Sequence, residues 1–176
     1  MTTPTVPTST WLRRRHIAIA VGALALTAVV VFGFGPYHDL AANAPDGELL
    51  DTLPRPDVSA FLAELGPAGR SQYGTVLALD TIFTLVHGVF LWVLLRFPLQ
   101  RLHAVLAHLA WLAIAATLCD LGENACIARL LLDPEAGGSW MLVQLTTAKF
   151  AVLIAAGGVL CLAWPALACV RLRRRA

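Results

Sequence analysis

Charge is the property that this sequence has least of. Charged residues make up 14% of its 176 residues, whereas hydrophobic residues make up 58%. An ordinary soluble domain carries about 25% charged residues, so this composition excludes a water-soluble fold. At roughly 20 apolar residues for each crossing, the chain has room for about four transmembrane helices and one short loop. The composition therefore predicts an all-α, multi-pass membrane protein with a single domain.

Common catalytic and binding motifs are absent as well. The chain has no glycine-rich phosphate loop, no zinc-type Cys/His spacing, no nucleophile elbow and no nucleic-acid-binding module. Its four cysteines include no Cys-x-x-Cys pair, and Cys119 and Cys126 lie about 10 Å apart along one predicted helix, too far to form a disulfide. The sequence therefore argues against a thiol-redox enzyme and against a nucleic-acid partner, and it indicates no cofactor.

Four apolar runs divide the chain into predicted transmembrane helices. They cover residues 17–35, 73–95, 102–132 and 140–170, within a membrane domain that extends over 13–170. Residues 1–12 are rich in Thr and Pro and are predicted to be a disordered cytoplasmic tail, and residues 171–176 form a basic one. The segment Ala42-Asn43-Ala44 resembles a signal-peptidase site, but the first run is too long for a signal peptide, so we expect an uncleaved helix.

The one long loop, residues 36–72, contains a short amphipathic pattern. Apolar side chains recur at helical spacing at Val58, Phe61, Leu62 and Leu65. Asp57 is placed to cap the start of this segment, and Gly66-Pro67 is placed to end it. The pattern predicts a short interfacial helix that lies on the membrane surface in the first outer loop.

Arginine is distributed unevenly over the ends of the predicted helices. Nine arginines flank one side, namely Arg13, Arg14, Arg15, Arg96, Arg101, Arg171, Arg173, Arg174 and Arg175. The other side has Arg55, Arg70 and Arg129, together with most of the acidic residues. Because positive residues accumulate on the cytoplasmic side of membrane proteins, this distribution predicts that both termini lie in the cytoplasm.

Ionisable side chains interrupt three of the predicted helices. The second carries Asp80, the third carries Asp120, Glu123 and Asn124, and the fourth carries Lys149. Turns predicted at 96–101 and 133–139 make neighbouring helices antiparallel, which places Asp80 level with residue 117 and Lys149 level with residue 123. The four ionisable groups then fall within roughly 10 Å of one another in depth. Since isolated charges inside a bilayer are costly, we expect a buried polar layer in the outer half of the bundle.

Other polar residues are predicted to line this layer. The candidate binding residues are Arg70, Tyr73, Thr84, His87, Asn124 and Thr146, with Arg70 and Tyr73 at the outer mouth. His108 is predicted at a level close to that of His87, so these two would either be hydrogen-bonded core histidines or extend the layer toward the cytoplasm. Charges of −3 and +1 cannot all persist in a medium of low dielectric constant. Either one carboxyl is protonated, or Arg70 or a bound cation joins the layer.

Three functions are compatible with such a layer. It would be part of the architecture of the bundle, holding a lipid or a small polar ligand. It would be a membrane-embedded acid–base enzyme of the isomerase or cyclase type acting on a lipid or isoprenoid, with Asp80 as acid, Asp120 or Glu123 as base and Lys149 beside them. It would be a proton- or ion-conducting subunit, which we expect to require a homodimer because four helices are few for a carrier. The spacing Asp120-x-x-Glu123 would also suit Mg²⁺, although the sequence commits to no metal.

Several short motifs carry a resemblance. Gly66-Pro67, Gly69-Arg70, Tyr73 and Leu79-Asp80, followed by Asp120-x-x-Glu123-Asn124 and Thr146-x-x-Lys149, are spread over roughly residues 56–165. This string resembles small bacterial four-helix integral membrane proteins of unassigned function, which are hypothetical proteins. The resemblance implies a multi-pass protein of the bacterial cytoplasmic (inner) membrane, surrounded by lipid. It implies no activity.

Overall fold

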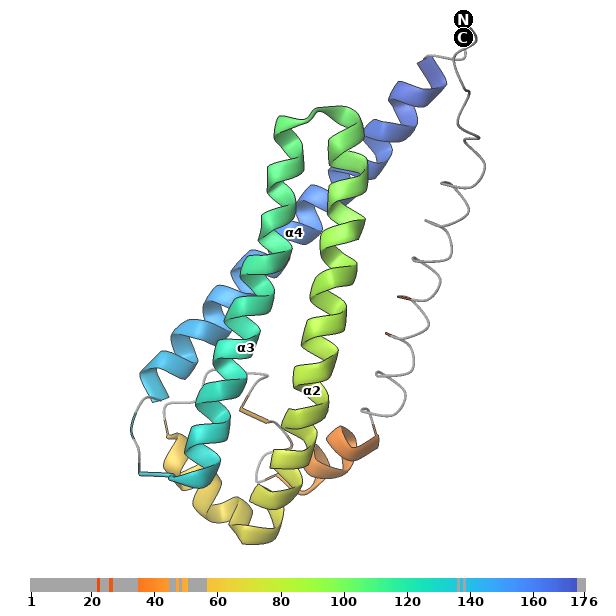
Figure 1. The fold of residues 1–176 in the computed structure, drawn as a ribbon. Coiled ribbons are helices and arrows are strands. Elements are labelled where there is room, and N and C mark those ends of the chain that lie inside the picture. Colours follow the sequence, from red (N-terminus) through yellow and green to blue (C-terminus); the bar gives the residue numbers. More distant parts are fainter. Residues whose placement is uncertain are drawn as a thin grey trace, which may run out of the picture.

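The computed structural model describes residues 22, 26, 35–44, 47, 49–50, 57–135, 137 and 139–173. Long helices dominate these residues, and no strand occurs among them. In chain order they are α2 (Val58–Leu102), the 3-10 helix η1 (Val105–Ala110), α3 (Trp111–Leu132) and α4 (Ser139–Arg173), as Figure 1 shows. The predicted all-α class is confirmed.

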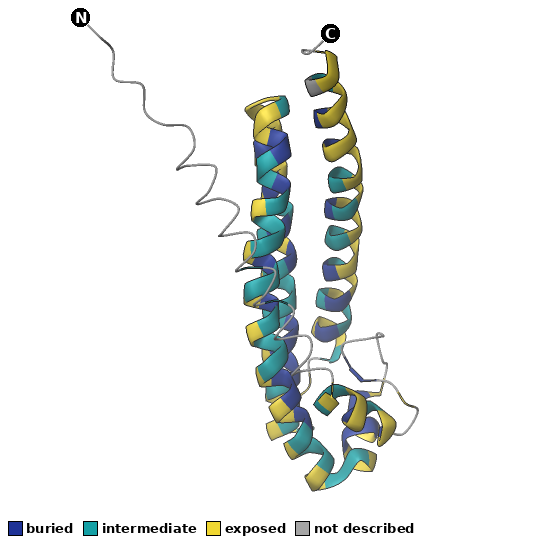
Figure 2. Ribbon diagram, turned by 90° about the vertical axis from the view of Figure 1, so that its right-hand side faces the viewer, coloured by how far each residue is buried: buried dark blue, intermediate teal, exposed yellow. Residues whose placement is uncertain are grey.

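Three helical stretches are long and apolar enough to cross a membrane: Val58–Leu102, Val105–Leu132 and Ser139–Val170. Large apolar side chains are exposed along their outward faces, as expected for contact with lipid (Figure 2); examples are Ile82, Val89, Phe150, Ile154 and Leu162. The chain is therefore a transmembrane protein. The first predicted helix, 17–35, lies almost entirely outside the described residues, so the four-helix bundle stays a prediction. The predicted tail 1–12 also lies outside them, and the predicted tail 171–176 is described only over 171–173, where α4 continues.

The beginning of α2 is bent at Gly66. This glycine has a φ of 68° and a ψ of 177°, in a region that residues with a Cβ rarely adopt, and the bend separates the first turns of α2 from the rest. Asp57 caps those turns by accepting a hydrogen bond from the N–H of Ala60 at 3.0 Å. The amphipathic segment is thus helical and continuous with α2, and its position on the membrane surface stays a prediction.

The turn between α2 and α3 lies later in the chain than the sequence suggested. Residues 96–101 were predicted to form this turn because proline disfavours a helix, but α2 continues through Pro98 to Leu102. The chain reverses at His103, which is extended at φ −162° and ψ 140°. Continuing the helix buries Leu95 and Leu99, and this packing outweighs the backbone hydrogen bond that Pro98 cannot make. The predicted turn at 96–101 is therefore wrong.

This later turn changes the register between α2 and α3. Asp80 contacts Asn124, and Thr84 contacts Asp120, so both pairs are centred on residue 102. Asp80 therefore lies level with Asn124 and not with residue 117. The predicted register was displaced by about two helical turns, or roughly 10 Å.

Two clusters of buried apolar side chains hold the helices together. The inner cluster lies toward the end where α2 turns into η1 and where α4 ends, and it comprises Leu95, Leu99, Ala110, Ala113, Ala156 and Ala163. The outer cluster lies toward the opposite end and includes Leu40, Leu49, Leu50, Phe61, Leu62, Tyr73, Ile127, Leu130 and Leu142. Along each helix the polar residues fall between these two clusters.

α2 and α3 approach closely between the polar residues and the inner cluster. A Cβ atom added at Gly88 would lie 2.0 Å from Oγ1 of Thr117 and 3.1 Å from its Cβ. The Thr117 hydroxyl already donates a hydrogen bond to the carbonyl of Ala113 at 2.8 Å. Glycine at position 88 therefore permits the contact between these helices.

We expect Gly88→Ala to lower the free energy of unfolding by about 1–3 kcal/mol, the usual cost of overpacking. The measurement is denaturant or thermal unfolding of the purified protein in detergent. Gly74→Ala is the matched control, because no atom lies within 4 Å of the Cβ it would introduce. It should leave stability unchanged or raise it by about 0.5–1 kcal/mol. Equal stability of the two variants would show that α2 and α3 do not pack closely at Gly88.

Candidate functional site

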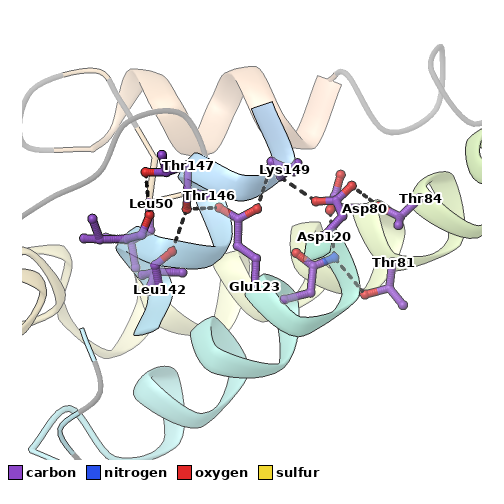
Figure 3. Close-up of polar contacts among 12 residues, drawn as sticks. Leu50, Asp80, Thr81, Thr84, Asp120, Glu123, Leu142, Thr146, Thr147 and Lys149 are labelled. Carbon is purple, nitrogen blue, oxygen red and sulfur yellow. Dashed lines mark hydrogen bonds and ion pairs between the residues drawn. The ribbon is translucent and has the colours of Figure 1, made fainter. Parts of the chain in front are cut away.

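Eight polar side chains from three helices form a layer between the inner and outer clusters, and their contacts fall into two groups (Figure 3). We call it the polar layer; its members are Asp80, Thr81 and Thr84 of α2, Asp120, Glu123 and Asn124 of α3, and Thr146 and Lys149 of α4. The side chains of α3 lie in the middle, in contact with those of α2 and with those of α4. The fold thus brings together all four ionisable residues that the sequence singled out.

Lys149 is the cation of the polar layer and is only 8% exposed. Its Nζ lies 3.2 Å from Oδ1 of Asp120 and forms a second ion pair with Oε2 of Glu123. The turn predicted at 133–139 placed Lys149 level with residue 123, and the observed register of α3 and α4 agrees with that prediction. The ammonium group therefore lies where Asp120-x-x-Glu123 would have held a hard cation. Over the described ranges, no group of three His, Cys, Asp or Glu side chains is arranged to hold a metal ion.

A threonine hydroxyl contacts the second oxygen of each of these carboxyl groups. Oγ1 of Thr84 donates to Oδ2 of Asp120 at 2.7 Å, and Oγ1 of Thr146 lies 2.5 Å from Oε1 of Glu123. Glu123 is fully buried, whereas the side chain of Asp120 is 21% exposed. The two carboxyls therefore have similar partners but unequal access to solvent.

Asp80 joins the polar layer through an amide. Nδ2 of Asn124 donates to Oδ2 of Asp80 at 2.8 Å and to Oγ1 of Thr81 at 3.3 Å, while Asn124 itself is buried. Sequence reasoning missed Thr81, although its position directly after Asp80 would have indicated a polar neighbour. This pair of contacts ties α2 to α3 beside the charged group.

A small cavity adjoins the polar layer on its inner side. It has a volume of about 20 Å³, enough for one water molecule, and it is lined by Asp120, His87, Gly88, Thr117 and Ala113, among others. His87 is half-buried, and its ring stacks on that of Phe83 with centroids 5.4 Å apart. Asp120 and His87 therefore border the same water-sized space. Thr117, one turn before Asp120, was not predicted to take part.

His108 neither extends the polar layer nor lies in the core, so both alternatives for this residue are wrong. It is exposed, and its Nδ1 contacts the carbonyl oxygen of Val105 at 3.0 Å. Two features of the structure explain the error. Residues 105–110 form a 3-10 helix, which changes the direction of each side chain, and the register of α2 and α3 differs from the predicted one.

The outer mouth predicted at Arg70 and Tyr73 is closed at Tyr73. The tyrosine is 1% exposed, and its hydroxyl accepts a hydrogen bond from the N–H of Leu50 at 3.0 Å. Leu49 and Leu50 are buried in the outer cluster and cover this end of the bundle. Arg70 is half-buried, and no hydrogen bond or ion pair joins it to the described part of the polar layer. In the sequence, the adjacent apolar residues Leu49 and Leu50 would have indicated that this part of the loop is buried.

We expect Tyr73→Phe to loosen the cover, because it leaves the buried N–H of Leu50 without its acceptor at a cost of about 1–3 kcal/mol. Hydrogen exchange measured by mass spectrometry should be faster at residues 49–50 than in the unmodified protein. Thr147→Val removes a hydroxyl from an exposed position on α4 and should leave that exchange unchanged. Unchanged exchange in Tyr73→Phe would contradict a holding role for this hydrogen bond.

We expect Lys149→Met to lower the free energy of unfolding by about 3–5 kcal/mol, because it leaves the partly buried carboxylate of Asp120 without its counter-charge. The double variant Lys149→Met with Asp120→Asn removes that carboxylate too and should recover part of the loss. Denaturant unfolding in detergent measures both, with Thr147→Val as the control. Equal stability of the single and double variants would show that Lys149 and Asp120 are not coupled.

Comparisons with protein-family models, curated proteins and solved structures find no match to this chain. No relative therefore supplies a reaction or a ligand for the polar layer. Its own chemistry consists of two carboxyls that share one ammonium group, a third carboxyl held by an amide, and a water-sized cavity between Asp120 and His87.

Proposed function

We propose that this protein is a proton-conducting membrane protein and that the polar layer is its proton-binding site. The observation that carries the proposal is the sharing of one ammonium group by Asp120 and Glu123 inside an apolar bundle. With both carboxyls ionised, these two residues and Lys149 would have a net charge of −1. An uncompensated charge at this depth is costly, and binding one proton removes it.

The water-sized cavity supports a route for that proton. It places Asp120 and His87 on the walls of one space, and a single water molecule there would lie next to both side chains. Histidine is suited to the next step, because its ring gains and loses a proton near neutral pH. His87 thus fits the role of a relay on the inner side of Asp120.

The two ends of the bundle are unequal, which supports an orientation for this route. Arg96, Arg101 and Arg173 belong to the inner end, whereas Asp57, Glu64 and Asp133 belong to the outer end. By the positive-inside rule, the inner end with its cavity faces the cytoplasm. As part of the proposal we place the chain in a bacterial inner membrane with both termini in the cytoplasm. In this arrangement the polar layer exchanges protons with the cytoplasm, while the outer cluster covers the opposite side.

Conduction across the whole membrane also requires an exit on the outer side. Tyr73 and Leu50 form the hydrogen bond that holds the cover there, so the exit would open where that bond breaks. With few helices in one chain, we infer that a second copy completes the path, in contact with the surrounding lipid. An acid–base enzyme acting on a lipid would use the same carboxyls without moving protons across the bilayer.

We expect the full-length protein in liposomes to admit protons when a membrane potential is imposed with potassium and valinomycin. A pH-sensitive dye inside the vesicles would report the flux. Asp120→Asn should slow this flux roughly 100-fold, as loss of a proton-transfer group does elsewhere. The physical reason is that the side-chain amide of this variant cannot take up a proton at the cavity.

His108→Gln is the matched control, since His108 is an exposed histidine outside the polar layer. It should conduct like the unmodified protein. Flux no greater than in protein-free vesicles, or equal flux in Asp120→Asn and the unmodified protein, would overturn the proposal. A new lipid product made by the protein in the absence of flux would favour the enzyme.

A further inference from the structure

A threonine hydroxyl carries a single proton, so it donates one hydrogen bond at a time and accepts others. Most helical threonines of this bundle donate that proton to the carbonyl four residues earlier, as is common for threonine inside helices. The pattern holds for Thr75, Thr81, Thr117 and Thr147, with distances of 3.4, 2.8, 2.8 and 2.8 Å. Such a hydroxyl has only its lone pairs left for a neighbouring side chain.

Thr81 shows the consequence within the polar layer. Its hydroxyl donates to the carbonyl of Leu77 and is therefore an acceptor toward Asn124. The neighbour in turn supplies the proton, since Nδ2 of Asn124 donates to Oγ1 of Thr81 at 3.3 Å. A threonine that is bonded back to its own helix therefore pairs with a donor.

Thr146 has the same arrangement but faces a carboxyl. Its Oγ1 lies 2.9 Å from the carbonyl oxygen of Leu142 and 2.5 Å from Oε1 of Glu123, as Figure 3 shows. One proton cannot form full hydrogen bonds to both oxygens. If Thr146 donates to Leu142 as the other threonines do, the proton between Thr146 and Glu123 belongs to the carboxyl.

We infer that, of the two carboxyls that share Lys149, Glu123 is protonated and Asp120 is ionised. In this assignment Glu123 donates from Oε1 to Oγ1 of Thr146 across the 2.5 Å contact, and its Oε2 faces the ammonium group of Lys149. Thr84 differs from Thr146, because its described hydrogen bond goes to Oδ2 of Asp120. Asp120 thus accepts from Thr84 and from Lys149, as a carboxylate does.

Burial and charge balance agree with this assignment. Lys149 and ionised Asp120 neutralise each other, and protonated Glu123 adds no charge. The neutral acid is then the fully buried one, and the ionised acid is the one that borders the water-sized cavity. The ionisable groups that interact with Glu123 are Lys149 of α4, and Asp120 and Cys126 of its own helix. The inference deepens the proposed function by naming Glu123 as the residue that holds the proton at rest. The role of Glu123 in conduction rests on the proposed function.

Infrared spectroscopy of the full-length protein in lipid bilayers tests the assignment, because a protonated carboxyl has a C=O stretch distinct from that of a carboxylate. At neutral pH we expect such a band. It should move to lower frequency when the protein is made with glutamate labelled with ¹³C at its side-chain carboxyl, and stay in place with aspartate labelled in the same way. Glu123→Gln, which preserves size and polarity, should remove the band completely.

A matched pair of threonine variants tests the hydrogen bond itself. Thr146→Val removes the acceptor of the Glu123 proton and should shift the band, whereas Thr84→Val should leave it unchanged. A band that follows labelled aspartate and disappears in Asp120→Asn, or no protonated-carboxyl band at neutral pH, would overturn the inference. These spectra are independent of proton flux. The assignment can therefore fail while conduction is observed, and conduction can fail while the assignment holds.

Discussion

The ammonium group of Lys149 between two carboxyls is the contact on which the arrangement of the helices depends. Apolar helices in lipid can slide past one another at little cost, because lipid tails and apolar side chains are equivalent surroundings. A buried lysine cannot, since every displacement that separates it from Asp120 and Glu123 leaves charges without partners. The ion pairs therefore fix the register of α3 and α4, and Thr84 extends this constraint to α2 through Asp120.

The two apolar clusters differ in the size of their side chains, and the cavity beside Asp120 lies on the side of the smaller ones. The inner cluster contains four alanines, and Gly88 and Ala116 lie beside it on the cavity wall. Small side chains leave the water-sized space that reaches Asp120. The outer cluster is made largely of leucine with Phe61, Tyr73 and Ile127, which fill the bundle up to the cover formed by residues 49–50. An even distribution of small residues would have made the two sides equivalent.

The sequence predicted the helical class, the transmembrane character and the meeting of Asp120, Glu123 and Lys149, because each follows from hydropathy and from the short turn at 133–139. It failed where packing outweighed a local preference. Pro98 predicted a turn, but the burial of Leu95 and Leu99 keeps the chain helical, which moved Asp80 by about two helical turns. The cover at Leu49-Leu50 was missed because these residues stand among Pro, Gly and acidic residues that usually mark an open loop. Which carboxyl holds the proton depends on the hydrogen bond from Thr146 to the carbonyl of Leu142, and no pattern of residues in the sequence shows that bond.

Asp120 links both neighbouring helices to the cavity. It accepts hydrogen bonds from α2 through Thr84 and from α4 through Lys149, and it borders the cavity shared with His87. Neutralising its charge would weaken both interhelical contacts at once, whereas a change at fully buried Glu123 affects α4 alone. Thr84 and Tyr73 lie on the same helix beyond the bend at Gly66, so a shift of α2 at Asp120 also reaches the hydrogen bond that holds Leu50. In the proposed function, proton uptake on the inner side and opening on the outer side are therefore connected by a rigid helix and not by a loop.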